Sequence, residues 1–275
     1  MDKEYIIKLA SSFVEDSPDN RVNRNIALST SVAGMKIFDE PIFAFGSTDD
    51  PYFQLLENQS IVGKHFINPK KWLPGGKTVI SFFLPFTESV RKSNTRDRCW
   101  PSEGWLHGRI EGHEFLLKVS LMLKQTLEEA GYKAVVPFLD EKYHNRSGEN
   151  YYEYSIPKFN SNWSERHVAF ICGLGTFGLS KGLITKKGVA GRFGSIITDL
   201  LVEATVRNYN NILEYCSKCG ICAQQCPANA ISLEKGKDHV ICSEFLDIIK
   251  KKYKPRYGCG KCQVNVPCEH EIPKI

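Results

Sequence analysis

Residues 216–227 read CSKCGICAQQCP, in which four cysteines and a proline follow the spacing C-x2-C-x2-C-x3-C-P. Three thiolates two residues apart can wrap one [4Fe–4S] cubane in a tight loop, with backbone N–H groups left free to bond the cluster sulfides. A zinc ribbon is the alternative, but its cysteine pairs are usually about 15–20 residues apart. The crowding of four cysteines in one loop therefore predicts an iron–sulfur cluster.

A second set of cysteines follows this loop, and Cys259 and Cys262 form another C-x2-C pair within it. A two-cluster ferredoxin would carry its next cysteine four residues after the pair, where this chain has Val266, and the cysteine comes two residues later as Cys268. Crossover ligation, in which the fourth cysteine of a motif serves the other cluster, predicts two sets of four. A single cluster with spare buried cysteines is the alternative. The first predicted cluster takes Cys216, Cys219, Cys222 and Cys268, and the other takes Cys226, Cys242, Cys259 and Cys262.

Length and composition favour a folded chain with room for one large domain and one small one. The 275 residues are 42% hydrophobic and 24% charged, and the net charge of +5 permits an anionic partner without requiring one. No stretch approaches the roughly 20 apolar residues that a membrane span needs, and the N-terminus has no apolar signal core. We therefore expect a cytoplasmic protein without a membrane partner, in which clustered cysteines bind metal rather than form disulfides.

The remainder of the chain predicts a mixed domain of helices and strands over residues 1–207, followed by the cysteine-rich domain over 208–275. Gly173, Gly175 and Gly178 match G-x-G-x-x-G, but the residues before them are patterned as a helix rather than a buried strand, which argues against a dinucleotide-binding turn. The expected elements are a helix ending before Pro18, strands at 77–86 and 195–204, and helices at 111–130 and 163–172.

The order of segments resembles epoxyqueuosine reductases and the catalytic cores of reductive dehalogenases. The similar segments are Glu165-Arg166, GLGTFG at 173–178, LIT at 183–185, GRFGSIITD at 191–199 and the two cysteine motifs, so the resemblance covers residue 165 to the C-terminus well and the first half loosely. It implies an α+β fold with a nitroreductase-related, cobalamin-binding domain and a C-terminal two-cluster ferredoxin-like domain. By position, it implies cobalamin contacts from Leu174, Gly175, Thr176, Phe177, Leu183, Thr185, Gly194 and Ser195.

The resemblance also implies a function. Two [4Fe–4S] clusters would pass electrons to cobalamin, which would reduce a small-molecule substrate, with flavodoxin or ferredoxin as the electron donor. The alternative is a non-catalytic, ferredoxin-type electron-transfer protein that serves a partner's corrinoid or flavin. The basic run at 250–256 has three open interpretations: a docking face for an acidic donor, a contact with tRNA phosphate, which is not favoured, or a solvated face.

The proton donor departs from the family pattern. Epoxyqueuosine reductases carry an aspartate a few residues before the Glu-Arg pair, and the matching position here is Phe159, which cannot donate a proton. We therefore expect a substrate other than epoxyqueuosine. If the alignment contains a gap, Asp140 or Glu141 takes the role. Otherwise the nearest candidates, and the expected catalytic residues, are Tyr151, Tyr152, Tyr154 and Glu153.

Overall fold

The computed structural model describes residues 1–145 and 160–274, and its centre is a four-stranded antiparallel sheet in the order β1-β2-β6-β3. Its strands are β1 (Ile42–Ser47), β2 (Thr78–Pro85), β6 (Gly191–Thr198) and β3 (Ala134–Val135). A hairpin of β4 (Gly175–Phe177) and β5 (Leu183–Thr185) lies outside this sheet, and β7 (Ile231–Ser232) pairs with β8 (Gly236–Lys237) near the C-terminus.

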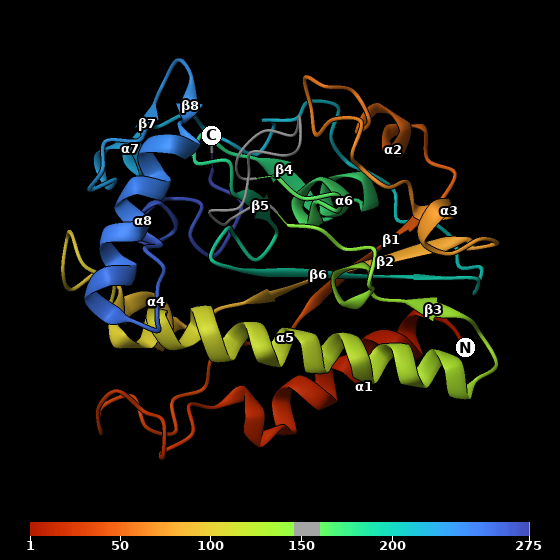
Figure 1. Cartoon of the computed structure of the whole chain (residues 1–275), viewed down its shortest axis with the longest axis horizontal. Helices are drawn as coiled ribbons and strands as arrows, with labels where there is room; N and C mark the ends of the chain where they lie inside the picture. Colours follow the sequence, from red (N-terminus) through yellow and green to blue (C-terminus); the bar gives the residue numbers. More distant parts are fainter. Residues whose placement is uncertain (146–159, 275) are drawn as a thin grey trace.

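Helices cover both faces of the sheet (Figure 1). On one face lie α1 (Lys3–Asp16) and the long α5 (Glu103–Glu129); the other face carries α6 (Glu165–Cys172) with α2 (Pro51–Leu55) and α3 (Pro69–Trp72). The other helices are α4 (Glu88–Ser93), α7 (Ile221–Gln224), α8 (His239–Tyr253) and the 3-10 turns η1 (Pro18–Asn20), η2 (Pro137–Leu139) and η3 (Lys261–Gln263). None of the helices in the described part of the chain combines the length and hydropathy needed to cross a membrane.

Strand β2 shows why the sheet is buried on both sides. All eight of its residues are buried, and successive side chains point to opposite faces, as the pleat requires. Ile80 and Phe82 pack into the core shared with α1 and α5, whereas Val79 and Phe83 pack into the core shared with α6. The mostly apolar run at 77–86 therefore predicted this central strand correctly.

The expected strand at 195–204 is wrong at both ends, because β6 spans Gly191–Thr198. Its limits follow those of its partner: Gly191 is paired with Pro85 and Thr198 with Thr78, the last and first residues of β2. Beyond Thr198 the sheet offers no residue of β2 to pair with. The glycines that precede the predicted strand therefore lie within it.

The expected helices fit more closely. Helix α1 ends at Asp16, before Pro18, and α6 ends at Cys172, where Gly173 caps it with a φ of +104°. A helix thus precedes the G-x-G-x-x-G run and a hairpin follows it, which excludes the strand–turn–helix order of a dinucleotide-binding turn. Helix α5 begins earlier than predicted, at Glu103, where the Ser102 side chain accepts a hydrogen bond from the Trp105 backbone.

The C-terminal segment packs on one end of α5 and on α4 (Figure 1). Arg256 donates to both carboxylate oxygens of Glu111 on α5, at 2.6 and 2.5 Å, and Arg91 on α4 pairs with Glu269 at 2.6 Å. Both pairs are largely buried and form charge-assisted hydrogen bonds, which are stronger than neutral ones. They hold the cysteine-rich segment in a fixed place against the sheet domain.

Candidate functional site

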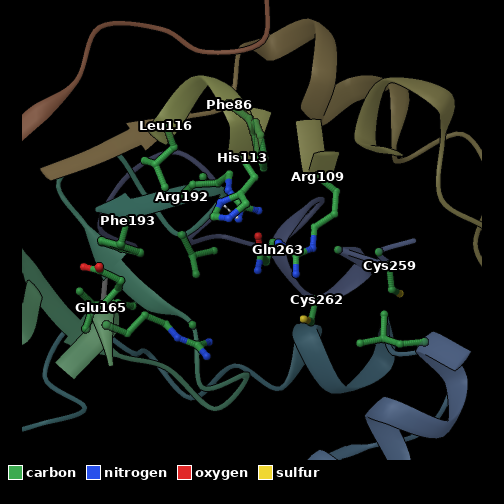
Figure 2. Close-up of a pocket in the computed structure, with 18 of the residues that line it drawn as sticks. Phe86, Arg109, His113, Leu116, Glu165, Arg192, Phe193, Cys259, Cys262 and Gln263 are labelled. Atoms are coloured by element: carbon green, nitrogen blue, oxygen red, sulfur yellow. Dashed lines mark hydrogen bonds between the residues drawn. The ribbon is translucent and has the colours of Figure 1, made fainter. Parts of the chain in front are cut away.

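A cavity of about 490 Å³ lies where α5, the first turn of α6 and strand β6 face the C-terminal segment (Figure 2). This volume is in the usual range of roughly 300–1,000 Å³ for ligand pockets. One part of its wall is apolar and another part carries charged side chains. The apolar part includes Phe86, Trp105, Leu116, Phe138 and Phe193, and the charged part includes Arg109, His113, Glu165, Arg166, Arg192 and Lys237.

The eight cysteines of the C-terminal segment occupy two separate places, and the division follows the two sets proposed from the sequence. One set lines the large cavity and is called the cavity set: Cys226, Cys242, Cys259 and Cys262. The other lines a small hollow beside the β4–β5 hairpin and is called the outer set: Cys216, Cys219, Cys222 and Cys268. Their role as cluster ligands stays a prediction.

Local backbone geometry brings the cysteines of each set together. Lys218 and Gly220 have positive φ values of 54° and 75°, which turn the chain between the cysteines of the first motif, and Gly260 at 68° does the same between Cys259 and Cys262. Helix α8 begins at His239, after an N-cap at Asp238, and presents Cys242 from its first turn.

Cys268, which comes two residues later than in two-cluster ferredoxins, is held beside the outer set by a backbone hydrogen bond. The Val189 N–H donates to the Cys268 carbonyl at 2.9 Å, which fixes the tail beside the turn that follows β5. The Val266 side chain occupies the position of the usual ligand and is buried, 7% exposed. The two-residue shift therefore still places Cys268 among the other three thiols of its set.

Apart from the exposed Cys219, the thiols of both sets are partly buried, and they lie close enough to affect one another's charge. Burial raises the pKa of Cys259 and of Cys268 to about 12, and neighbouring thiols add to the effect. The pKa of Cys222 is raised to about 11 by burial and by Cys262, Cys216 and Cys219. These groups are therefore neutral thiols at neutral pH without a metal, and iron would bind them as thiolates with release of their protons. The donor set, eight thiols in two fours, therefore fits two [4Fe–4S] clusters.

Two further observations bear on metal binding. The Ala230 N–H donates to the Cys226 sulfur at 3.3 Å, the kind of backbone hydrogen bond that tunes cluster thiolates. Over residues 1–145 and 160–274, no three His, Cys, Asp or Glu side chains stand close enough to hold a single metal ion.

Glu165, at the first turn of α6, places a carboxyl group in the cavity wall (Figure 2). Burial raises its pKa from 4.5 to about 7, and hydrogen bonds with Ser195 and Trp163 offset part of this rise. Trp163 also donates to the Ser195 hydroxyl at 2.9 Å, which fixes both groups. The Oε2 atom of Glu165 is buried and has no hydrogen-bond partner in the structure. This carboxyl group can therefore exchange a proton near neutral pH.

The predicted cobalamin contacts divide into two groups. Leu183, Gly194 and Ser195 line the cavity. The other five, which are Leu174, Gly175, Thr176, Phe177 and Thr185, are buried in and around the β4–β5 hairpin and lie outside the cavity lining.

Two glycines of this group have structural reasons to be glycine. A Cβ at Gly175 would collide with the backbone of Ile184 across the hairpin. A Cβ at Gly194 would come within 2.6 Å of the Phe82 ring on β2. Close packing of the hairpin and sheet thus accounts for both residues without a ligand.

The predicted catalytic residues, Tyr151, Tyr152, Tyr154 and Glu153, lie outside the described residues. Sequence reasoning assigned no role to Arg109, His113, Glu165 or Arg192, all of which line the cavity. A signal was present for two of these residues: Arg109 and His113 are four residues apart, and so share one face of a helix.

Comparison with known proteins bears on the iron–sulfur region and on the fold. Residues 211–232 match the 4Fe-4S binding domain family. The chain is 23% identical to the epoxyqueuosine reductase of Leadbetterella byssophila over 74% of its own length and 63% of the relative. It is 26% identical to the enzyme of Aliivibrio fischeri, over 74% of this chain and 52% of the relative.

Solved structures of the same two enzyme classes are similar to this chain in fold. One is an epoxyqueuosine reductase with an epoxyqueuosine-modified tRNA stem loop. The match covers 97% of this chain and 65% of the reductase chain, with a TM-score of 0.55 at 19% identity. A reductive dehalogenase, whose structure suggested a mechanism for B12-dependent dehalogenation, matches 84% of this chain and 30% of its own, with a TM-score of 0.53 at 15% identity.

The protein is a distant homologue of the epoxyqueuosine reductases, with the α+β fold of these enzymes and of reductive dehalogenases and a 4Fe-4S region near the C-terminus. It spans about half to two thirds of the length of the curated relatives that it matches. The resemblance seen in the sequence motifs is thereby confirmed at the level of fold and distant homology.

Proposed function

We propose that the protein is a cobalamin-dependent reductase in which two [4Fe–4S] clusters deliver electrons to a corrinoid in the large cavity. The observation that carries this proposal is the position of the two cysteine sets. All four thiols of the cavity set line the cavity that would hold the cofactor, and the outer set lies in a separate hollow. Electrons would pass from a cluster at the outer set to a cluster at the cavity set and from there to the corrinoid.

The outer set suits the entry of electrons. Cys219 is exposed, whereas none of the other seven cysteines of the two sets is. A cluster held there would be accessible to a small donor protein such as flavodoxin or ferredoxin. The Cys262 thiol of the cavity set contributes to the raised pKa of Cys222 in the outer set, so the two clusters would lie within electrostatic reach.

The cavity has features that fit a broad, amide-rimmed ligand. Two buried polar atoms in its wall, Oε2 of Glu165 and Nε of Arg192, lack hydrogen-bond partners in the structure. The small residues Gly194 and Ser195 expose one edge of β6 to the cavity. When bound, a corrinoid would supply a strongly reducing cobalt centre, and the protein would supply orientation, protons and exclusion of water.

Glu165 is the described residue best suited to supply the proton that reductive removal of a hydroxyl or halide group needs. Its carboxyl group lines the cavity, and its pKa of about 7 keeps a large fraction of it protonated at neutral pH. Ser195 and Trp163 hold the carboxyl group in place. The tyrosines at 151, 152 and 154 and Glu153 remain candidates for the same role.

The substrate that we propose is a small molecule other than epoxyqueuosine. The position matching the proton-donating aspartate of epoxyqueuosine reductases holds Phe159, and phenylalanine cannot donate a proton. A non-catalytic electron-transfer protein is the second candidate, favoured by the ferredoxin-type motif alone. The large cavity beside the cavity set is the feature that a simple carrier does not need.

Anaerobic reconstitution tests the proposal. The reconstituted protein should contain about eight iron and eight sulfide ions per chain and should take up cobalamin with a change in its absorption spectrum. Cys262→Ser should lower the iron content, whereas Cys99→Ser, outside both sets, should not. Protein with both clusters intact that takes up no cobalamin at high micromolar concentration would favour the carrier function instead.

A further inference from the structure

Two arginines from different elements line the same cavity. Arg109 extends from α5 toward Gln263 and Cys262, and Arg192 lies on β6 beside His113 (Figure 2). Burial, and after it the positive charge of Arg109, lowers the pKa of Arg192 to about 9, so the two guanidinium groups are close enough to repel each other.

Neither guanidinium group has a carboxylate partner within ion-pair distance in the part of the chain that the structure describes. Arg192 donates from Nη2 to His113 Nδ1 at 2.8 Å, and its Nε atom is buried without any partner. His113 accepts this bond as a neutral ring, because burial and the charges of Arg192 and Arg109 lower its pKa to about 4. The positive charge of Arg192 is therefore not compensated by its neighbour.

Arg109 is held in place by a neutral group as well. Its Nη2 atom donates to the Tyr257 hydroxyl at 2.8 Å, and its guanidinium group stacks 4.7 Å above the Tyr257 ring. A neutral tyrosine orients the group and leaves its charge unpaired. Both arginines are thus fixed in position, with their charge available to a ligand.

The other two cations of the cavity wall have a different partner. Arg166 lies near Cys262, and Lys237 lies near Cys262 and Cys242, so both cations stand beside thiols of the cavity set. These side chains compensate the negative charge of a cluster. The charged groups that act on Arg192 are Arg109 and Tyr257. Because Arg109 extends toward Cys262 and Arg192 lies on β6, the Arg109–Arg192 pair borders both the cavity set and the apolar part of the wall.

The wall around the pair is apolar and largely aromatic. Phe86, Leu116, Phe138 and Phe193 line the same cavity. A flat, apolar body would pack against these side chains, and a single anionic group at its end would reach both arginines. Guanidinium groups bind carboxylate and phosphate through paired hydrogen bonds, for which their planar geometry is well suited.

We propose that Arg109 and Arg192 form an anion-binding site that takes the carboxylate or phosphate group of a flat, largely apolar ligand. The site deepens the proposed function by naming the chemical class of one ligand of the cavity. The anion has two possible sources: the substrate, or the phosphodiester group of the cobalamin nucleotide loop.

The first experiment measures binding to the protein with reconstituted clusters, by anaerobic calorimetry with benzoate, phenyl phosphate and neutral benzyl alcohol. The wild type should bind the two anions more tightly than the alcohol. Arg109→Gln and Arg192→Gln should each weaken anion binding roughly 10- to 100-fold, the usual effect of losing a hydrogen bond to a charged group. Arg24→Gln, at an exposed arginine, is the matched control and should bind like the wild type.

The second experiment separates the two sources of the anion by comparing cobalamin with cobinamide, which lacks the nucleotide loop and its phosphodiester. If Arg192→Gln binds cobalamin less tightly and cobinamide unchanged, the site holds the cofactor's phosphate. If both corrinoids bind equally to variant and wild type while benzoate binding is lost, the site holds a substrate anion.

The cluster absorption spectrum and the melting temperature of each variant show that it is folded. Wild-type protein that binds neither anion better than benzyl alcohol, and shows no preference for cobalamin over cobinamide, would overturn the proposal. Anion binding without any corrinoid uptake would keep the anion site and reject the proposed function.

Discussion

Replacing Glu165 by glutamine should remove a specific loss of stability that occurs as the pH rises from about 4.5 to about 7. The folded protein keeps the carboxyl group protonated up to about pH 7, whereas the unfolded chain ionises it near 4.5. Between these values the folded state binds more protons than the unfolded state, so the free energy of unfolding falls as the pH rises. The stability from this group is complete below pH 4.5 and is lost as the pH rises through about 7. Glutamine keeps the shape of the side chain and does not titrate.

The size of the effect follows from the pKa of about 7. From about pH 5.5 to about pH 7 only the unfolded chain ionises, which costs about 1.4 kcal/mol per pH unit and about 2 kcal/mol in all. Above pH 7 both states ionise and the difference stays constant. For a chain of this size, about 2 kcal/mol corresponds to roughly 4–8 °C in melting temperature. His113, His167 and His239 have pKa values of about 4 in the folded protein and 6.5 when unfolded, so they add stability as the pH rises to about 6.5, equally in wild type and variant.

The assay compares the melting temperatures of wild type and Glu165→Gln, both with reconstituted clusters, at about pH 5.5 and about pH 8.5 under anaerobic conditions. The difference between the two proteins cancels the contributions of other titrating groups and of the clusters. The wild type should lose roughly 4–8 °C more than the variant between the two pH values. An equal loss in both proteins would show that Glu165 ionises normally in the folded state and would remove it as the proton source.

Three further predictions concern the clusters, the substrate and the packing of the C-terminal segment. Cys268→Ser should lower the iron content by about half and leave the cluster of the cavity set intact in the electron paramagnetic resonance spectrum. An unchanged iron content would contradict the assignment of Cys268 as a ligand of the outer cluster. The reduced protein should not convert epoxyqueuosine in tRNA to queuosine, because a phenylalanine stands where the family carries its aspartate; efficient conversion would refute this expectation. Gly260→Ala should destabilise the protein by about 1–3 kcal/mol more than Gly75→Ala, because both have positive φ but only a Cβ at Gly260 collides with the Trp105 ring, and equal melting temperatures would count against this reading.

The sequence predicted those features that depend on residues close together in the chain. The spacing of the cysteines gave the two sets of four, and the apolar run at 77–86 gave the central strand. The charged wall of the cavity could not be found in this way, because Arg109 and Tyr257 meet only when α5 packs against a segment 148 residues later. The limits of β6 were missed for the same reason, since they are set by pairing with β2.

The outer and cavity sets are joined within the first cysteine motif, by the three residues between its third and fourth cysteines. Cys222 of the outer set and Cys226 of the cavity set are separated by three residues, and α7, at Ile221–Gln224, ends between them. Four residues of helix advance the chain by only about 6 Å, so clusters bound by these two cysteines would be held at a short and fixed separation. The slip of the last cysteine to position 268 does not disturb this link, because that residue is held from outside the motif by Val189. The C-x3-C connection therefore limits the distance between the two clusters, while the Val189 contact and the Arg91–Glu269 pair hold the tail that supplies Cys268.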